Sequence, residues 1–124
     1  MNRWIAPTFD EFGRSMGIEG LAPDRDGGLS LLLDGERHLA FQVLDDAVLM
    51  LLAQPVGHGD SLGCKLRALA LCHLRHGWNL PVRAGLSRDG RLVFMSHIPV
   101  RQFLLPVVEQ AFDLLTRLHA QARH

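Results

Sequence analysis

Hydrophobic residues recur with helical spacing at both ends of the chain. Near the N-terminus, Ile5, Phe9, Phe12 and Met16 lie four, three and four positions apart, which predicts an amphipathic helix over about residues 3–16. The segment that ends near residue 122 has the same spacing in Phe103, Leu104, Val107, Val108, Ala111, Phe112, Leu115 and Leu118. Both segments are therefore expected to form helices that pack one face against a core.

Three short apolar segments between these helices predict strands. Residues 29–33 run into Asp34-Gly35, a dipeptide typical of hairpin turns. Residues 38–44 alternate between the two faces, as in a half-buried strand. Residues 47–53 are apolar throughout, which favours a central strand covered on both faces and is also compatible with a short buried helix.

The helix predicted at about residues 61–76 is unusually apolar. A surface helix normally has an apolar stripe a little over about 100° wide. Here only Lys65, Arg67, His73 and Arg75 interrupt the helical wheel. Such an arc is too wide for a helix with one ordinary buried face.

A hairpin over residues 80–99 has the same excess. Its second strand, at about residues 91–97, is apolar on both sides, because Leu92 and Phe94 point one way while Val93 and Met95 point the other. Helices of the same chain would explain this if they covered both faces. A second subunit explains it better, since three helices cannot readily cover both faces of five strands.

The element order is α-β-β-β-α-β-β-α, which predicts an α+β sandwich of an antiparallel sheet packed with helices. The 124 residues suit a single domain, 1–124. Lysine and arginine number 13, as do aspartate and glutamate, so no electrostatic binding of nucleic acid is expected. No apolar run is long enough for stable membrane insertion. Cys64 and Cys72, about 12 Å apart on one helix, lie beyond disulfide reach, which favours the cytoplasm.

The segment "CHLRH" is the strongest candidate for chemistry. Cys72 and His76 are four positions apart and His73 and His76 three, so each of these pairs can share a helix face. A metal site would need a further ligand, for example His58 or His97. A buried cysteine beside two histidines at a helix end is the favoured interpretation. A small metal-dependent enzyme, or a dimeric ligand-binding domain centred on these residues, is the alternative.

No other motif indicates catalysis. The sequence has no G-x-S-x-G nucleophile elbow, and "GHGDSLG" lacks the lysine and spacing of a phosphate-binding loop. The pairs Asp24–Asp26 and Asp45–Asp46 fall in predicted turns, where aspartate is favoured for local hydrogen bonding. We therefore expect neither an enzyme nor a cofactor.

In its motifs the whole chain resembles the class I chaperones of bacterial type III secretion, and among them the SycN type. The resemblance lies in "WIAP", "LPVRAG", "LVFMS" and "LLPVVEQAFDLLTRL", in that order. It implies a cytoplasmic dimer that binds an N-terminal segment of a secreted protein without ATP. The implied partners are a second subunit of the YscB type, or a second copy of the chain, and a secreted gatekeeper of the YopN type. The near-zero net charge departs from the acidic balance common in the family.

The resemblance also implies sites. Dimerisation through the second helix and the strand after it, together with the doubly apolar hairpin, indicates Leu62, Leu66, Leu69, His73, Leu80, Val82, Arg83, Val93 and Met95. Cargo would be held in apolar grooves and by strand addition at a sheet edge. The corresponding residues are Trp4, Ile5, Phe9, Phe12, Leu31, Leu33, Leu39 and Phe41. A place in the core is the alternative for each of them and the favoured interpretation for Phe12 and Phe41.

Overall fold

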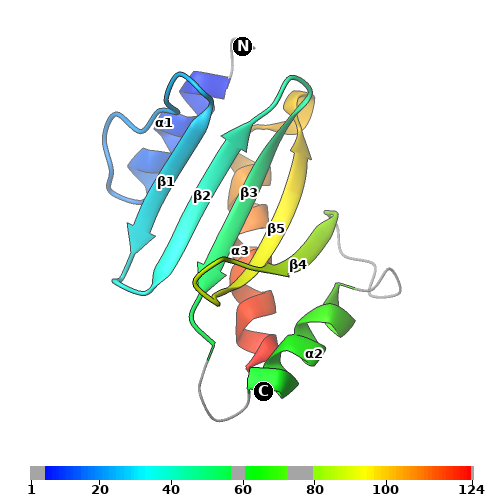
Figure 1. Cartoon of the computed structure of the whole chain (residues 1–124). Coiled ribbons are helices and arrows are strands. Elements are labelled where there is room, and N and C mark those ends of the chain that lie inside the picture. The colour runs from blue at the N-terminus through cyan, green and yellow to red at the C-terminus, as the bar shows by residue number, and fades with distance from the viewer. Residues whose placement is uncertain (1–4, 57–60, 73–79, 124) are drawn as a thin grey trace.

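A computed structural model describes residues 5–56, 61–72 and 80–123, and it confirms the predicted α+β architecture (Figure 1). The element order is α1 (Ile5–Ser15), β1 (Gly28–Leu33), β2 (Arg37–Val43), β3 (Ala47–Gln54), α2 (Ser61–Leu71), β4 (Val82–Leu86), β5 (Leu92–Pro99), a 3-10 turn η2 (Val100–Gln102) and α3 (Leu105–Ala122). Each predicted helix and strand is present, with ends that differ by a few residues.

The five strands form one antiparallel sheet in the order β1-β2-β3-β5-β4. Strands that follow one another in the sequence are joined by short turns, except that α2 lies between β3 and β4, and β4 occupies the edge beyond β5. The β1–β2 turn follows the expected chemistry, because Asp34 and Gly35 both have positive φ, 23° and 82°. Strands β1 and β4 are the two edges of the sheet.

One face of the sheet carries the core. Helices α1 and α3 pack on this face, behind the sheet in the view of Figure 1. Aromatic rings join the layers: Phe9 meets Phe41 edge-on with ring centroids 5.1 Å apart and lies 4.9 Å from Phe103. The buried hydroxyl of Thr8 donates to the carbonyl of Phe103 over 3.0 Å, which ties α1 to the start of α3.

The opposite face of the sheet is not covered by a described helix (Figure 1). The sequence favoured cover on both faces of the β3 segment, and the described residues provide it on one face only. On that face Val48, Met50 and Leu52 are fully buried, whereas Leu49 and Leu51 on the other face remain half-exposed. The apolar run therefore exceeds what the described helices bury.

A buried histidine lies at the centre of the helix–sheet contact. His119 of α3 is 2% exposed, its Nε2–H donates to the carbonyl of Leu52 over 2.6 Å, and its ring meets Phe94 edge-on at 4.7 Å. Burial, together with the positive charges of Arg123 and Arg37, lowers the pKa of His119 to about 4, although the hydrogen bond to Leu52 acts in the opposite direction. The folded chain therefore holds this imidazole neutral at physiological pH.

We predict that His119 lowers the free energy of unfolding as the pH falls. The unfolded imidazole takes up its proton near pH 6.5 and the folded one only near pH 4, so stability present above pH 6.5 is lost as pH falls toward 4. Between pH 7 and pH 5 this costs about 2 kcal/mol. Urea unfolding at both pH values should show a larger loss for the native chain than for His119→Leu. Equal losses in the two proteins would contradict the prediction.

Candidate interaction surfaces

Helix α2 exposes three large aliphatic side chains in a row. Leu62, Leu66 and Leu69 lie on one helix face at spacings of four and three, and they are 70%, 57% and 63% exposed. The other face of the helix buries Cys64 and Ala68. A soluble chain rarely leaves such a row uncovered. These three leucines, the α2 stripe, are the strongest candidate surface for a protein partner.

The rest of the fold holds α2 in place. The helix packs against α3 and β4, and the Nε of Arg67 donates to the carbonyl of Ala122 over 2.8 Å. Because Cys64 and Ala68 face the core, the α2 stripe must point outward. The stripe is thus a consequence of how the helix docks.

The sheet register divides the other predicted dimer residues between two faces. Val82 pairs with the buried Ser96, so it points toward the helices, and Leu80 also packs beside the core. Arg83 pairs with Met95 and therefore points to the uncovered face, as does Val93. The predicted set thus covers two surfaces, while His73 lies outside the described residues.

Most of the predicted cargo residues are core residues. Ile5, Phe9, Phe12, Leu39 and Phe41 are 0–2% exposed, so their side chains are not available to a partner in this structure. Their burial follows from the packing of α1 against β2. Leu31 and Leu33 of β1 stay half-exposed, and Trp4 lies outside the described residues. The candidate cargo surface is thereby narrowed to the β1 edge.

The β1 edge has unused backbone groups. The N–H of Val43 donates to the carbonyl of Gly27 over 2.8 Å, which identifies these two residues as a hydrogen-bonded pair of the antiparallel ladder. Every second residue from Gly27 therefore bonds to β2. Ser30 and Leu32 direct their N–H and C=O groups outward, where no described residue bonds to them. Such an edge is a template for strand addition.

The loop before β1 limits this edge. The N–H of Asp24 donates to the carbonyl of Gly28 over 2.8 Å, so the first residue of the strand is already occupied. The open part spans residues 30–32, beside the half-exposed Leu31 and Leu33 on the helix side. Sequence reasoning missed the two outward-facing residues, because alternation along a strand does not reveal which strand is an edge.

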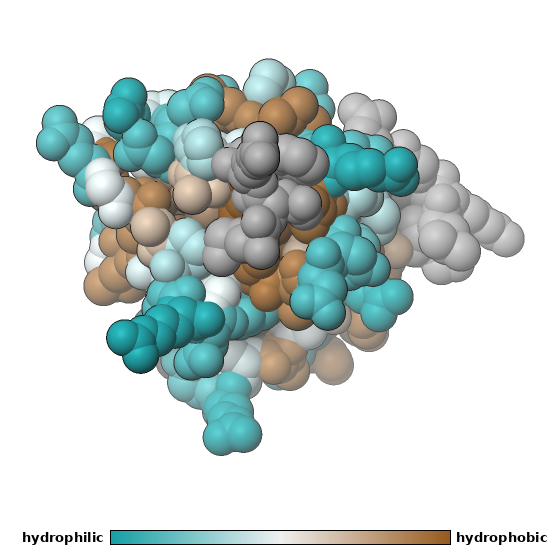
Figure 2. All heavy atoms as spheres, turned by 90° about the horizontal axis from the view of Figure 1, so that it is seen from above, coloured by the Kyte–Doolittle hydropathy of each residue, from teal (hydrophilic) through white to brown (hydrophobic). Residues whose placement is uncertain are grey.

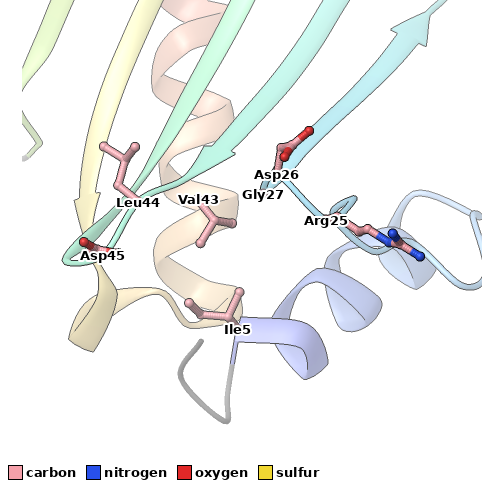
Figure 3. A pocket seen from close by; sticks show the side chains of 7 residues that line it. All are labelled: Ile5, Arg25, Asp26, Gly27, Val43, Leu44 and Asp45. Carbon is pink, nitrogen blue, oxygen red and sulfur yellow. The ribbon is translucent and has the colours of Figure 1, made fainter.

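A hollow of about 360 Å³ lies at the end of the molecule where α1 begins. Its lining comes from the α1 start, the β1 loop and the β2–β3 turn: Ile5, Arg25, Asp26, Gly27, Val43, Leu44 and Asp45 (Figure 3). Apolar and polar side chains lie side by side at this end (Figure 2). Gly27 has a φ of +82°, and a Cβ there would come within 2.9 Å of the Val43 carbonyl. The lining thus combines an arginine and two aspartates with three aliphatic side chains.

The "CHLRH" segment gains no support as a metal site. Within the described part of the chain, no group of three His, Cys, Asp or Glu residues could hold a metal ion. His73 and His76 lie outside that part. Burial raises the pKa of the Cys72 thiol, which disfavours the reactive thiolate.

Among the helices of the described residues, none combines the length and hydrophobicity that spanning a bilayer requires.

Comparison with known proteins gives a consistent family match. The model of the family described as type III secretory system chaperone SycN matches residues 4–122. Chaperone protein SycN of Yersinia enterocolitica is 26% identical over 123 residues, covering 95% of each chain. SycN of Yersinia pseudotuberculosis has the same identity and coverage.

Solved structures share the fold at lower identity. A chain of the HopA1–SchA chaperone–effector complex superposes with a TM-score of 0.73 at 21% identity, covering 94% of this chain and 91% of its own. A chain of the ExsC–ExsE complex has a TM-score of 0.74 at 21% identity, covering 96% and 90%. Both chains therefore share the arrangement of helices and strands seen in this one.

Proposed function

This chain belongs to the SycN family of type III secretory system chaperones, and we propose that it is one subunit of a cytoplasmic dimer that binds the N-terminal region of a secreted gatekeeper of the YopN type. Its relatives are chaperones and not enzymes. The function is therefore binding: the dimer keeps the secreted protein competent for export.

The α2 stripe carries the proposal. Exposing these three aliphatic side chains to water is unfavourable in free energy, since each is more than half exposed. Burying them against a partner surface would remove that cost. Leu80 and Val82, half-buried where β4 begins, would extend the contact. We propose a second chaperone subunit of the YscB type as the occupant, because SycN-type chaperones pair with such a subunit.

The proposed cargo contact is the β1 edge. An extended segment of the gatekeeper would add a strand beside Ser30 and Leu32, while its side chains pack against Leu31 and Leu33. Two of the structural neighbours come from the HopA1–SchA chaperone–effector complex and the ExsC–ExsE complex, which supports a protein partner for a chaperone of this fold. Backbone pairing would supply affinity, and the two leucines would supply preference for apolar cargo.

Co-expression tests the function directly. The chain should co-purify with a YscB-type subunit as a complex of defined mass, and the pair should capture the N-terminal region of a YopN-type protein. Alone, the chain should self-associate or be poorly soluble. A monodisperse monomer that binds neither protein would overturn the proposal.

We predict that Leu66→Asp prevents assembly with the second subunit. Leu66 is 57% exposed, so the isolated chain tolerates the carboxylate, whereas the assembled interface would bury it without a partner. The expected loss is several kcal/mol, about a thousandfold in affinity. Analytical ultracentrifugation of the mixed subunits measures it.

The matched control is Leu104→Asp. Leu104 is 49% exposed and precedes α3 as its N-cap, a position that favours aspartate. It lies at the opposite end of an 18-residue helix from Ala122, which contacts α2, a separation of about 27 Å along the helix. Assembly should survive this change, and a loss as large as that for Leu66→Asp would indicate non-specific damage.

We predict that Leu32→Pro weakens cargo binding and leaves dimerisation intact. Proline removes an outward N–H without breaking the β1–β2 ladder, and edge strands tolerate it. The loss of one backbone hydrogen bond should lower cargo affinity about fivefold. Calorimetry with Leu32→Ala as control, which keeps the N–H, separates backbone from side chain; equal affinity of the two variants would exclude strand addition here.

A further inference from the structure

The uncovered face of the sheet has an unusual composition. Register places these residues on it: Ser30, Leu32, His38, Ala40, Gln42, Leu49, Leu51, Ala53, Arg83, Val93, Met95 and His97. Its centre is aliphatic, and its ionisable side chains are all basic types. The chain contains 13 aspartates and glutamates, yet none lies in any of the five strands. A neutral chain thus presents one face without acidic residues.

This face is hollowed where three strands meet. A depression of about 460 Å³ is lined by Leu49, Pro81, Arg83, Met95 and His97. Leu49 is opposite His97 across β3 and β5, and Met95 is opposite Arg83 across β5 and β4. The depression therefore has an aliphatic floor, Leu49 and Met95, with a guanidinium and an imidazole at its margin.

The guanidinium of Arg83 makes no polar contact with the described residues. Its side chain is exposed, and no described residue accepts a hydrogen bond from it or forms an ion pair with it. By contrast, Arg37 pairs with Asp34 and Arg91 pairs with Asp89. A guanidinium held beside an aliphatic hollow recognises a carboxylate better than any other common group.

We propose that this depression, the β3–β5–β4 hollow, binds a peptide segment in which an aliphatic side chain is followed by a carboxylate. The aliphatic group would lie on Leu49 and Met95, and the carboxylate would accept hydrogen bonds from Arg83. The charge of the face argues for this occupant: a segment rich in lysine or arginine would be repelled.

The identity of the partner as secreted cargo rests on the proposed function, whereas the chemistry of the hollow does not. The α2 stripe and Val82 lie outside this face. The inference therefore reassigns Arg83, Val93 and Met95 from the predicted dimer interface to a peptide contact, and the second subunit would cover the stripe without them. Cargo would then have two separate contacts, an extended strand at β1 and an acidic, aliphatic segment on the open face.

Methyl NMR of the full chain carrying Leu66→Asp, which prevents association through the α2 stripe, tests the hollow without any natural partner. The probes are two acetylated and amidated hexapeptides, one alternating leucine and glutamate and the other leucine and glutamine. We expect the glutamate peptide to shift the methyl signals of Leu49 and Met95 saturably. The glutamine peptide should bind on the order of fivefold more weakly, because it lacks the charge-assisted contact.

Two variants assign the effect to one side chain. Arg83→Gln should abolish the preference for glutamate, while Arg101→Gln, which changes another exposed arginine without an ion pair, should retain it. Equal binding of the two peptides to the chain that retains Arg83 would overturn the inference. So would shifts confined to Leu32 or to the α2 stripe, or methyl shifts that depend only on protein concentration, which would indicate a second copy on this face.

The outcome is independent of the co-expression experiment. Failure to co-purify with a second subunit would overturn the proposed function and leave the peptide result standing. Co-purification without a glutamate preference would retain the function and eliminate the hollow.

Discussion

The packing of α3 across β3 and β5 is the contact on which the rest of the structure depends. This helix touches α1, α2, β3 and β5, so it joins every layer of the described chain. Its inner face buries Val108, Ala111, Leu115 and Leu118 completely. His119 adds a directional contact, because its hydrogen bond to Leu52 fixes the helix in register along β3. Helices α1 and α2 both contact α3, so the position of α3 also sets theirs.

Placing the helices on one side has a direct consequence for the surface. With α1 and α3 on one face, α2 packs at the end of α3 and beside β4. That position buries the small Cys64 and Ala68 and leaves the larger leucines of the same helix outside. The other face of the sheet keeps half-exposed aliphatic side chains for the same reason. The proposed binding surfaces are thus the apolar side chains that the core between the helices and the sheet does not bury.

The charge distribution separates these surfaces from the rest of the molecule. Carboxylates occupy helices, loops and turns, where several serve local structure; Asp34, for example, pairs with Arg37 across the β1–β2 turn. The strands carry none. A net charge of zero therefore conceals a face whose ionisable groups are arginine and histidine. Such a face distinguishes partners by sign as well as by hydrophobicity.

The order and type of the helices and strands follow from the sequence alone. Helical and strand periodicity depend only on residues a few positions apart in the chain. The spacing of Ile5, Phe9 and Phe12 predicted α1, and the Asp34-Gly35 pair predicted the first hairpin. Exposure was decided by the tertiary structure. The same spacing describes the buried face of α1 and the exposed leucines of α2, and only the position of α3 tells them apart. Register likewise placed Arg83 and Val82 on opposite faces, since neighbours in a strand point apart.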